Sequence, residues 1–431
     1  MAAVTPAHLV AGLLRRGGAA RGGVAGVAAA GAAAAAQFGL VVVVTRTVSA
    51  AGAGTFFAAT AVALMAAGIT KLDAGNGLVY FIARAKTYGY RGMTGYIRAA
   101  TVPCVVAACA AAALLWPRVG PVAAMVPVIV LGDVLLAATR GFGSLRPTVL
   151  LDGLLLPVAQ FALVAAVALA GRPGWLAAAW GLPYLPVLVL AAVAVRGRAP
   201  RCPYLPGTGR DLWRYTAPRS LAGAVQAVLQ RLDVVVVALL AGPAQAAVYT
   251  AATRFKVVGQ LANQGLAQAV QARLVSALAG GELARARELY QAATIWLVLL
   301  TWPVWLAYAV LAPWLLTVFG PGYGTAAPVA LVLAATMMVA TACGMVDVVL
   351  TAAGHTGASL LNLLAAVACT LALDLALVPA HGALGAVAGW SGGVLVKNLL
   401  PLWQLHRRYG LHPFGRHTLP ALRLRTWAAP A

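Results

Sequence analysis

Four charged side chains lie inside two apolar runs that are each long enough to cross a membrane. Arg231 and Asp233 interrupt the run "VLQRLDVVVVALLAG" at 228–242, and Arg254 and Lys256 interrupt the run that follows it. A charge at the centre of a membrane helix costs roughly 2.5–3.5 kcal/mol on insertion scales. Three cations and one anion retained at such a cost predict a site for an anionic group.

The four charges are expected at one depth. Arg231 lies 11 residues before the glycine that ends its run, and Arg254 lies 11 residues after the proline that begins the next run. At about 1.5 Å per residue, both lie roughly 16 Å from the outer end, near the bilayer midplane. Asp233 and Lys256 are within one turn of that level. An Asp233–Arg254 ion pair is one explanation, and it leaves Arg231 and Lys256 to be explained, at least one of them by a ligand.

Polar residues mark one face of each run. At 100° per residue, seven side chains of the second run fall within an arc of about 100°: Tyr249, Thr253, Lys256, Gln260, Asn263, Gln264 and Gln271. In the first run Gln226, Gln230 and Asp233 share a face, and Arg231 points to the opposite side. Hydrogen bonds between helices account for two or three of these residues, whereas the whole stripe favours a water-filled cavity.

These patterns define two sets of candidate residues. The candidates for substrate binding in a central cavity are Arg231, Arg254, Lys256, Gln230, Gln260, Asn263 and Gln264. The candidates for a coupling or structural charge are Asp233 and Asp374.

The composition is that of a polytopic membrane protein, because 62% of the 431 residues are hydrophobic and only 9% are charged. Soluble domains carry about 25% charged residues. Runs long enough to span a bilayer predict twelve transmembrane helices, near 19–44, 50–70, 97–116, 121–139, 149–170, 174–195, 219–241, 245–271, 291–312, 326–351, 359–379 and 383–404.

The distribution of basic residues predicts the orientation. With an inside amino terminus, 24 of the 31 lysines and arginines fall in cytoplasmic segments, three fall outside and four lie in spans. This bias follows the positive-inside rule, so we expect both termini in the cytoplasm and the chain in a bacterial cytoplasmic (inner) membrane. The net charge of +22 then reflects topology and attraction to anionic lipids, and nucleic acid is not an expected partner.

The two halves of the sequence repeat. A shift of 193 residues places "QFGLVVVV" at 37–44 on "QRLDVVVV" at 230–237, and "FFAAT" at 56–60 on "YTAAT" at 249–253. We therefore predict a six-helix lobe at 1–195, a cytoplasmic linker at 196–218, a second six-helix lobe at 219–404 and a basic cytoplasmic tail at 405–431. Both lobes start inside, so their pseudo-two-fold axis runs along the membrane normal, a plan common in transporters.

Catalytic and metal-binding patterns are not found in the sequence. The five cysteines form no CxxC pair, the six histidines are scattered, and no GxxxxGK[ST] motif occurs. The short external loops lack the acidic or histidine clusters that a membrane enzyme acting on polyprenyl phosphates would use. We expect no cofactor, no metal and no enzymatic activity.

The chain resembles bacterial polysaccharide flippases of the Wzx type, in the multidrug/oligosaccharidyl-lipid/polysaccharide (MOP) exporter superfamily, which includes MATE and MVF transporters. The resemblance is carried by "RLDVVVVALLAG…AVYTAATRF" at 231–255, "LLTVFGPGYGTAAPVALVL" at 315–333, "LALDLALVPAHGALGAVAG" at 371–389 and "ATRGFGSLRPTVLLDGLLLPVAQ" at 138–160. Asp374 departs from the pattern, because relatives commonly have asparagine there.

The resemblance implies a MATE-like fold and alternating access. It implies a substrate of undecaprenyl-pyrophosphate-linked oligosaccharide, received by Arg231, Arg254 and Lys256, and polysaccharide-assembly enzymes as further partners. A proton- or sodium-coupled multidrug antiporter of the same superfamily is the alternative. It would need buried carboxylates, and the sequence places only Asp233 near the midplane. A membrane enzyme acting on polyprenyl-phosphate lipids ranks third.

Overall fold

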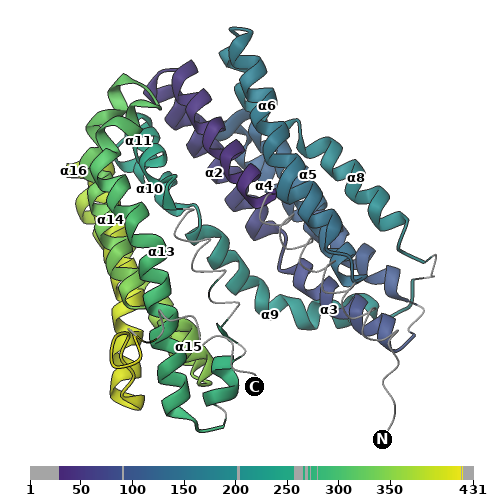
Figure 1. The fold of residues 1–431 in the computed structure, drawn as a ribbon. Coiled ribbons are helices and arrows are strands. Elements are labelled where there is room, and N and C mark those ends of the chain that lie inside the picture. The colour runs from purple at the N-terminus through teal and green to yellow at the C-terminus, as the bar shows by residue number, and fades with distance from the viewer. Residues whose placement is uncertain are drawn as a thin grey trace, which may run out of the picture. The chain divides into compact units, whose positions relative to one another are not determined.

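The computed structural model describes residues 29–89, 92–200, 204–256, 266, 270–271, 273–278, 280–418 and 420. Every regular element in this part of the chain is a helix (Figure 1). Eight helical segments are long and apolar enough to cross a membrane, or nine if the interrupted segment Thr208–Leu229 plus Leu232–Leu240 is one span. The prediction of an all-helical, multi-pass membrane protein is confirmed.

Several of the eight segments contain more than one helix. Met93–Gly141 comprises α4 (Met93–Val119) and α5 (Met125–Gly141), joined by a short 3-10 turn. Helix α16 (Thr356–Tyr409) is broken at Gly382, where φ is 54°. The number of spans therefore depends on how such segments are divided, and the count of twelve stays a prediction.

The chain divides into two compact units near the middle of its sequence. The first unit comprises Met1–Thr47 and Ala59–Arg231, and the second comprises Val48–Ala58 and Leu232–Ala431. Helix α9 (Thr208–Leu229) begins inside the segment 196–218 that the sequence suggested as a linker, and it belongs to the first unit. The structural division therefore follows α9 instead of preceding it.

The first unit is built around α5. This helix packs against α3, α4 and α8, and its apolar side chains Val130, Val134 and Ala137 are buried. Its helices are Ala29–Thr47, α2 (Ala50–Thr70, of which the first residues group with the second unit), α3 (Ala74–Thr87), α4, α5, a π-helical turn (Thr148–Leu155), α6 (Leu156–Leu169), a 3-10 turn (Pro173–Trp175), α7 (Leu176–Gly181), α8 (Tyr184–Arg196) and α9.

Helix α3 lies in the segment between the second and third predicted spans. Its residues Leu78, Phe81, Ile82 and Ala85 are buried, at spacings that place them on one helix face. Arg84, which precedes the buried Ala85, lies off that face and is exposed. The sequence placed only a basic cytoplasmic segment here, because 14 residues are too few to span a bilayer and gave no membrane signal.

The second unit contains a row of long helices. Helix α13 packs against α14, and α14 packs against α16, as Figure 1 shows for the green and yellow end of the chain. The helices are α10 (Leu232–Leu240), α11 (Pro243–Thr253), α13 (Leu283–Thr317), a 3-10 turn (Pro321–Ala326), α14 (Ala327–Ala342), α15 (Val346–Ala352) and α16.

Small residues set the packing of the two halves of α16. A Cβ atom added to Gly385 would overlap the backbone carbonyl of Leu377, and one added to Gly393 would overlap Thr370. Gly385 lies against Leu377, whereas Gly393, further along the chain, lies against Thr370, which comes earlier. The two halves therefore run antiparallel across the break at Gly382. Close glycine contacts of this kind are how membrane helices gain packing without a hydrophobic driving force between them.

Candidate functional site

The candidate site begins where the chain leaves one helix and enters another. Gln230 and Arg231 form a turn between α9 and α10, and Asp233 lies in the first turn of α10. The Asp233 Oδ1 atom accepts a hydrogen bond of 2.9 Å from the N–H of Val234. The first N–H groups of a helix lack partners within it, so a carboxylate at this position stabilises the start of α10.

This interruption corrects one expectation from the sequence. A continuous helix over 219–241 would have placed Gln226, Gln230 and Asp233 on one face and Arg231 opposite them. The structure ends α9 with an N–H of Arg231 that donates to the carbonyl of Val228, a tight i−3 bond, and restarts the helix at Leu232. Helical periodicity does not hold across the turn, so the face of one part does not predict the face of the other.

Asp233 of α10, Tyr249 of α11 and Lys256, just beyond α11, form a closed set of polar contacts. The Tyr249 hydroxyl donates to Oδ2 of Asp233 at 2.8 Å, and Lys256 Nζ donates to the same hydroxyl at 3.2 Å. Lys256 Nζ also lies 3.5 Å from Asp233 Oδ2. Tyr249 is fully buried, and the side chains of Lys256 and Asp233 are only 13% and 22% exposed. Each charge is therefore neutralised by a near neighbour and hydrogen-bonded, as burial of charge requires.

This geometry decides between the pairings that the sequence left open. Asp233 contacts Lys256 and Tyr249, so the anion is engaged by the cation two residues beyond the expected partner, Arg254. Arg254 ends α11 and lies close enough to Lys256 for their like charges to interact. Tyr249 and Lys256, two members of the predicted polar stripe, are in contact although Lys256 lies beyond the end of α11, and the stripe as a whole stays a prediction.

Helix α16 completes the surroundings of Lys256. The ammonium lies 4.1 Å from the centre of the Trp390 ring and 5.2 Å from that of Tyr249. Both distances are within the range of a cation–π interaction. The sequence gave no signal for Trp390, because its span is otherwise apolar and rich in glycine.

Asp374, also on α16, adds a second buried carboxylate. It is 2% exposed and lies within electrostatic range of both Asp233 and Lys256. Its Oδ1 atom has no hydrogen-bond partner among the described residues. A side chain at Gly389 would overlap this oxygen, so the glycine is what admits the carboxyl group between the two halves of α16. The sequence placed Asp374 near the outer end of its span and did not bring it to the charges.

Arg231 differs from the other candidates. It is half-buried, and among the described residues no carboxylate lies within ion-pairing distance of its guanidinium. Gln230 beside it is exposed. The candidates Gln260, Asn263 and Gln264 lie outside the described residues. The structure therefore joins Asp233, Lys256 and Asp374 in one site and leaves Arg231 for another interaction.

Comparisons with known proteins identify the fold. No protein-family model and no curated protein sequence matches the chain, but solved structures do. An inward-facing MATE family transporter of the MOP superfamily covers 88% of this chain and 94% of its own, with a TM-score of 0.67 and 16% identity. The lipid II flippase MurJ in an inward closed conformation covers 93% and 91%, with a TM-score of 0.72 and 10% identity.

A third structure is a MOP superfamily transporter from Pyrococcus furiosus, described by a reverse polarity of its binding pocket, with 15% identity, a TM-score of 0.51 and coverage of 89% and 95%. The chain has the fold of a MOP superfamily transporter. This MOP fold confirms the MATE-like architecture that the sequence resemblance implied. The proteins that share this fold include both drug transporters and a lipid flippase, so the fold by itself does not show what a protein that has it transports.

Proposed function

We propose that the chain is a flippase that moves undecaprenyl-pyrophosphate-linked oligosaccharide from the cytoplasmic to the outer leaflet of a bacterial inner membrane. The observation that carries this proposal is Arg231, a half-buried guanidinium within a membrane span that forms no ion pair or hydrogen bond among the described residues. A cation in that position without a protein partner favours an anionic ligand. A pyrophosphate group has the charge and the oxygen atoms that a guanidinium binds in a bidentate manner.

The backbone around Arg231 supports the same proposal. Helix α10 begins at Leu232, directly after this arginine. In transporters, helices broken inside the membrane present positive N-terminal ends to anionic groups of the substrate. The similarity to a lipid II flippase over 93% of the chain is in keeping with a lipid-linked substrate.

Lys256 takes a different part from the one that the resemblance implied. Its contacts with Asp233, Tyr249 and Trp390 occupy the ammonium, so substrate would have to compete for it. We propose that Arg231 receives the headgroup and that Lys256 holds Asp233 in place. Both termini are proposed to lie in the cytoplasm, with anionic lipids and polysaccharide-assembly enzymes as partners.

The test is transport by proteoliposomes of a fluorescent polyprenyl-pyrophosphate-linked sugar. Arg231→Gln should lower the rate by about tenfold or more, the loss of one charge-assisted contact in the transition between leaflets. Arg231→Lys should retain part of the transport rate, because it keeps the positive charge. Arg198→Gln, an exposed arginine of the first unit, is the matched control and should transport normally. Normal transport by Arg231→Gln would refute the proposal.

Asp374 favours one alternative, the cation-coupled drug antiporter. A buried carboxylate, Asp374, within electrostatic range of the partly buried Asp233 is a pair that such a mechanism would use to exchange a proton or sodium ion. If this function is correct, Asp374→Asn should abolish drug resistance in cells that express the chain, and Arg231→Gln should leave that resistance intact. The reverse pattern would support the flippase.

A further inference from the structure

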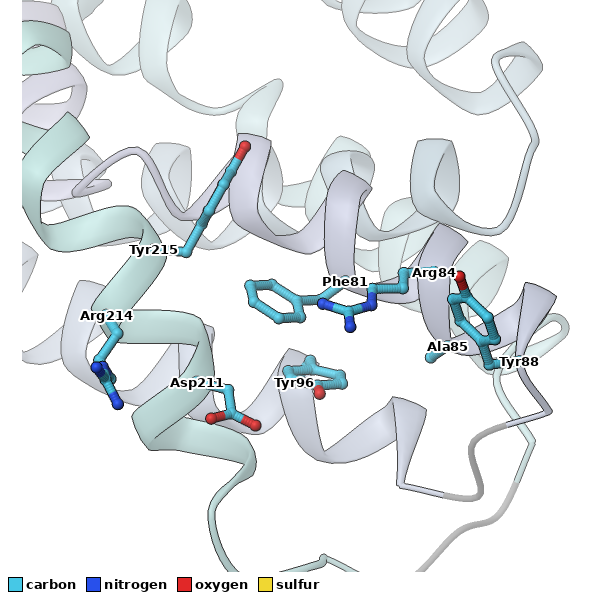
Figure 2. Close-up of a pocket in the computed structure, with 8 residues that line it drawn as sticks. All are labelled: Phe81, Arg84, Ala85, Tyr88, Tyr96, Asp211, Arg214 and Tyr215. Atoms are coloured by element: carbon cyan, nitrogen blue, oxygen red, sulfur yellow. The ribbon is translucent and has the colours of Figure 1, made fainter.

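A cavity of about 690 Å³ lies in the first unit, away from the charges described above. It is lined by three segments, α3 with the residue that follows it, the start of α4 and the start of α9 (Figure 2), through Phe81, Arg84, Ala85, Tyr88, Tyr96, Asp211, Arg214 and Tyr215. Its volume is within the range of small-molecule sites. Nothing in the proposed transport reaction uses these residues.

Aromatic rings fix the walls of the cavity. Phe81 stacks on Tyr96 with ring centres 5.0 Å apart and meets the edge of Tyr215 at 5.7 Å. Tyr80 stacks on the same Tyr215 at 4.8 Å. The three helices are thus joined by ring contacts, which add stability beyond the area they bury. These ring contacts hold together the helices that form the walls of the cavity.

Close packing of α3 on α9 holds the remaining side. A Cβ atom at Gly77 would overlap Thr216, so glycine allows the two helices to approach. Asp73, just before α3, accepts a 2.9 Å hydrogen bond from Nε of Arg219 on α9. These contacts lie beside the cavity and do not involve the charged residues that line it.

The charges that line the cavity are mainly positive. Arg84 and Arg214 are both exposed, and among the described residues neither lies within 4.0 Å of a carboxylate. Arg84 extends toward Phe81 in Figure 2, and its Cζ atom is 5.9 Å from the centre of the Tyr88 ring. Asp211 is the acidic residue of the lining, and it forms no ion pair among the described residues. Two guanidinium groups against one carboxylate leave a net positive site.

The position in the chain indicates what reaches the cavity. Helix α3 connects two membrane spans, which end at Thr70 and begin at Met93, so its residues lie at the membrane surface. Tyr80 and Tyr88 are 44% and 77% exposed there, as expected of aromatic residues at the lipid headgroup level. Phosphate is the main anionic group at that level, and guanidinium groups match it in charge and geometry.

We propose that this cavity binds a phosphate-bearing anion through Arg84 and Arg214, with the rings of Phe81, Tyr96 and Tyr215 against the rest of the ligand. The phosphate comes from a phospholipid headgroup or from a soluble phosphate ester. The negative charge of Asp211 repels an anion in the cavity and so lowers the affinity of the site.

The test measures binding to the purified full chain in detergent. One arm titrates phosphatidylglycerol, with phosphatidylcholine for comparison, and counts bound lipid by native mass spectrometry. The other titrates glycerol 1-phosphate by calorimetry. The variant Arg84→Gln with Arg214→Gln should weaken binding of the effective ligand by about tenfold or more, as expected when two charge-assisted contacts are lost. The matched control, Arg196→Gln with Arg198→Gln, removes the same charge from exposed positions outside the cavity and should bind as the wild type does.

Asp211→Asn provides a change of opposite sign and is a conservative change at an exposed position. It should tighten binding severalfold, because it removes the negative charge of the cavity lining, which repels the anion. Dependence on the two arginines in the lipid arm alone identifies a headgroup site, and the same dependence with glycerol 1-phosphate identifies a soluble phosphate ester. Equal loss in the cavity variant and the control, or weaker binding by Asp211→Asn, would overturn the proposal. Size-exclusion profiles and thermal unfolding check that each variant is folded.

Discussion

The two copies of the internal repeat differ in the polar contacts that they form. In the first repeat, residues 37–63, Gln37 donates to Oε1 of Gln160 at 3.2 Å, and Gln160 donates to the carbonyl of Trp180 at 3.0 Å. In the second, residues 230–256, the polar contacts are those of Asp233, Tyr249 and Lys256. The first is a neutral amide network and the second is a charged one.

The positions of the charged network are apolar in the first repeat. With the shift of 193 residues, Asp233 aligns with Leu40, Tyr249 with Phe56 and Lys256 with Ala63. Leu40 and Ala63 are buried, so these positions face the interior in the first copy as well. One fold thus accepts either an apolar set or a charged set at equivalent places. All three polar members are present together in the second repeat, because each would be costly without the others.

The largest loss of stability is expected when the ion pair of Asp233 and Lys256 is broken. Asp233→Asn leaves Lys256 in a largely buried position without its counter-ion, and removing one partner of such a pair costs about 3 kcal/mol. Thermal unfolding in detergent, with the amount of membrane-inserted protein, measures the loss.

The control for that loss gives the second repeat the residues of the first. The triple variant Asp233→Leu, Tyr249→Phe and Lys256→Ala contains no unpaired charge or hydroxyl at these positions. It should recover at least half of the lost stability. If it is no more stable than Asp233→Asn, the cost does not come from the uncompensated lysine, and the comparison of the two repeats fails.

A smaller effect is expected from Tyr249→Phe, which also installs the residue of the first repeat. The change removes two hydrogen bonds but leaves Lys256 and Asp233 at ion-pairing distance, so the cost should be about 1.5 kcal/mol. Tyr80→Phe is the control, because its exposed ring keeps its stacking on Tyr215. A loss as large as that of Asp233→Asn would show that the hydroxyl, rather than the ion pair, dominates.

The smallest effect is expected in the neutral network. Gln37→Leu removes one amide donor, while Gln160 keeps its bond to Trp180, so the free energy of unfolding should fall by about 1 kcal/mol or less. The transport rate of the stable variant should remain normal, measured as for Arg231→Gln. A transport defect comparable to that of Arg231→Gln would mean that the first repeat also contributes to substrate handling.

Much of the architecture could be predicted from local sequence. Long apolar runs indicate membrane helices wherever backbone groups must be satisfied without water, and this holds whatever the neighbours are. Helical spacing placed Tyr249 and Lys256 on one face, and their side chains are in contact, although Lys256 lies beyond the end of α11. Helix α3 was missed because a short amphipathic helix outside the membrane gives no signal in a search for apolar runs.

The interruption at Gln230 and Arg231 was not predictable from local sequence. No proline or glycine marks the turn. What stabilises the restart is the carboxylate of Asp233 at the first turn of α10, held from the other side by Tyr249. That support comes from a second helix, so it exists only after the two have packed.

The sequence by itself determined that this chain is a polytopic helical membrane protein, and it predicted two related halves with the charge concentrated in the second. Hydrophobicity and periodicity are properties of neighbouring residues, so they survive without a structure. Only the tertiary structure decided the partners of those charges. Lys256 contacts Asp233 of α10 and Trp390 of α16. Asp374 occupies the space left by Gly389, within electrostatic range of Lys256 and Asp233, and Arg231 has no ion-paired carboxylate among the described residues. Such pairings depend on distances between segments that are far apart in the chain, and no local pattern encodes them.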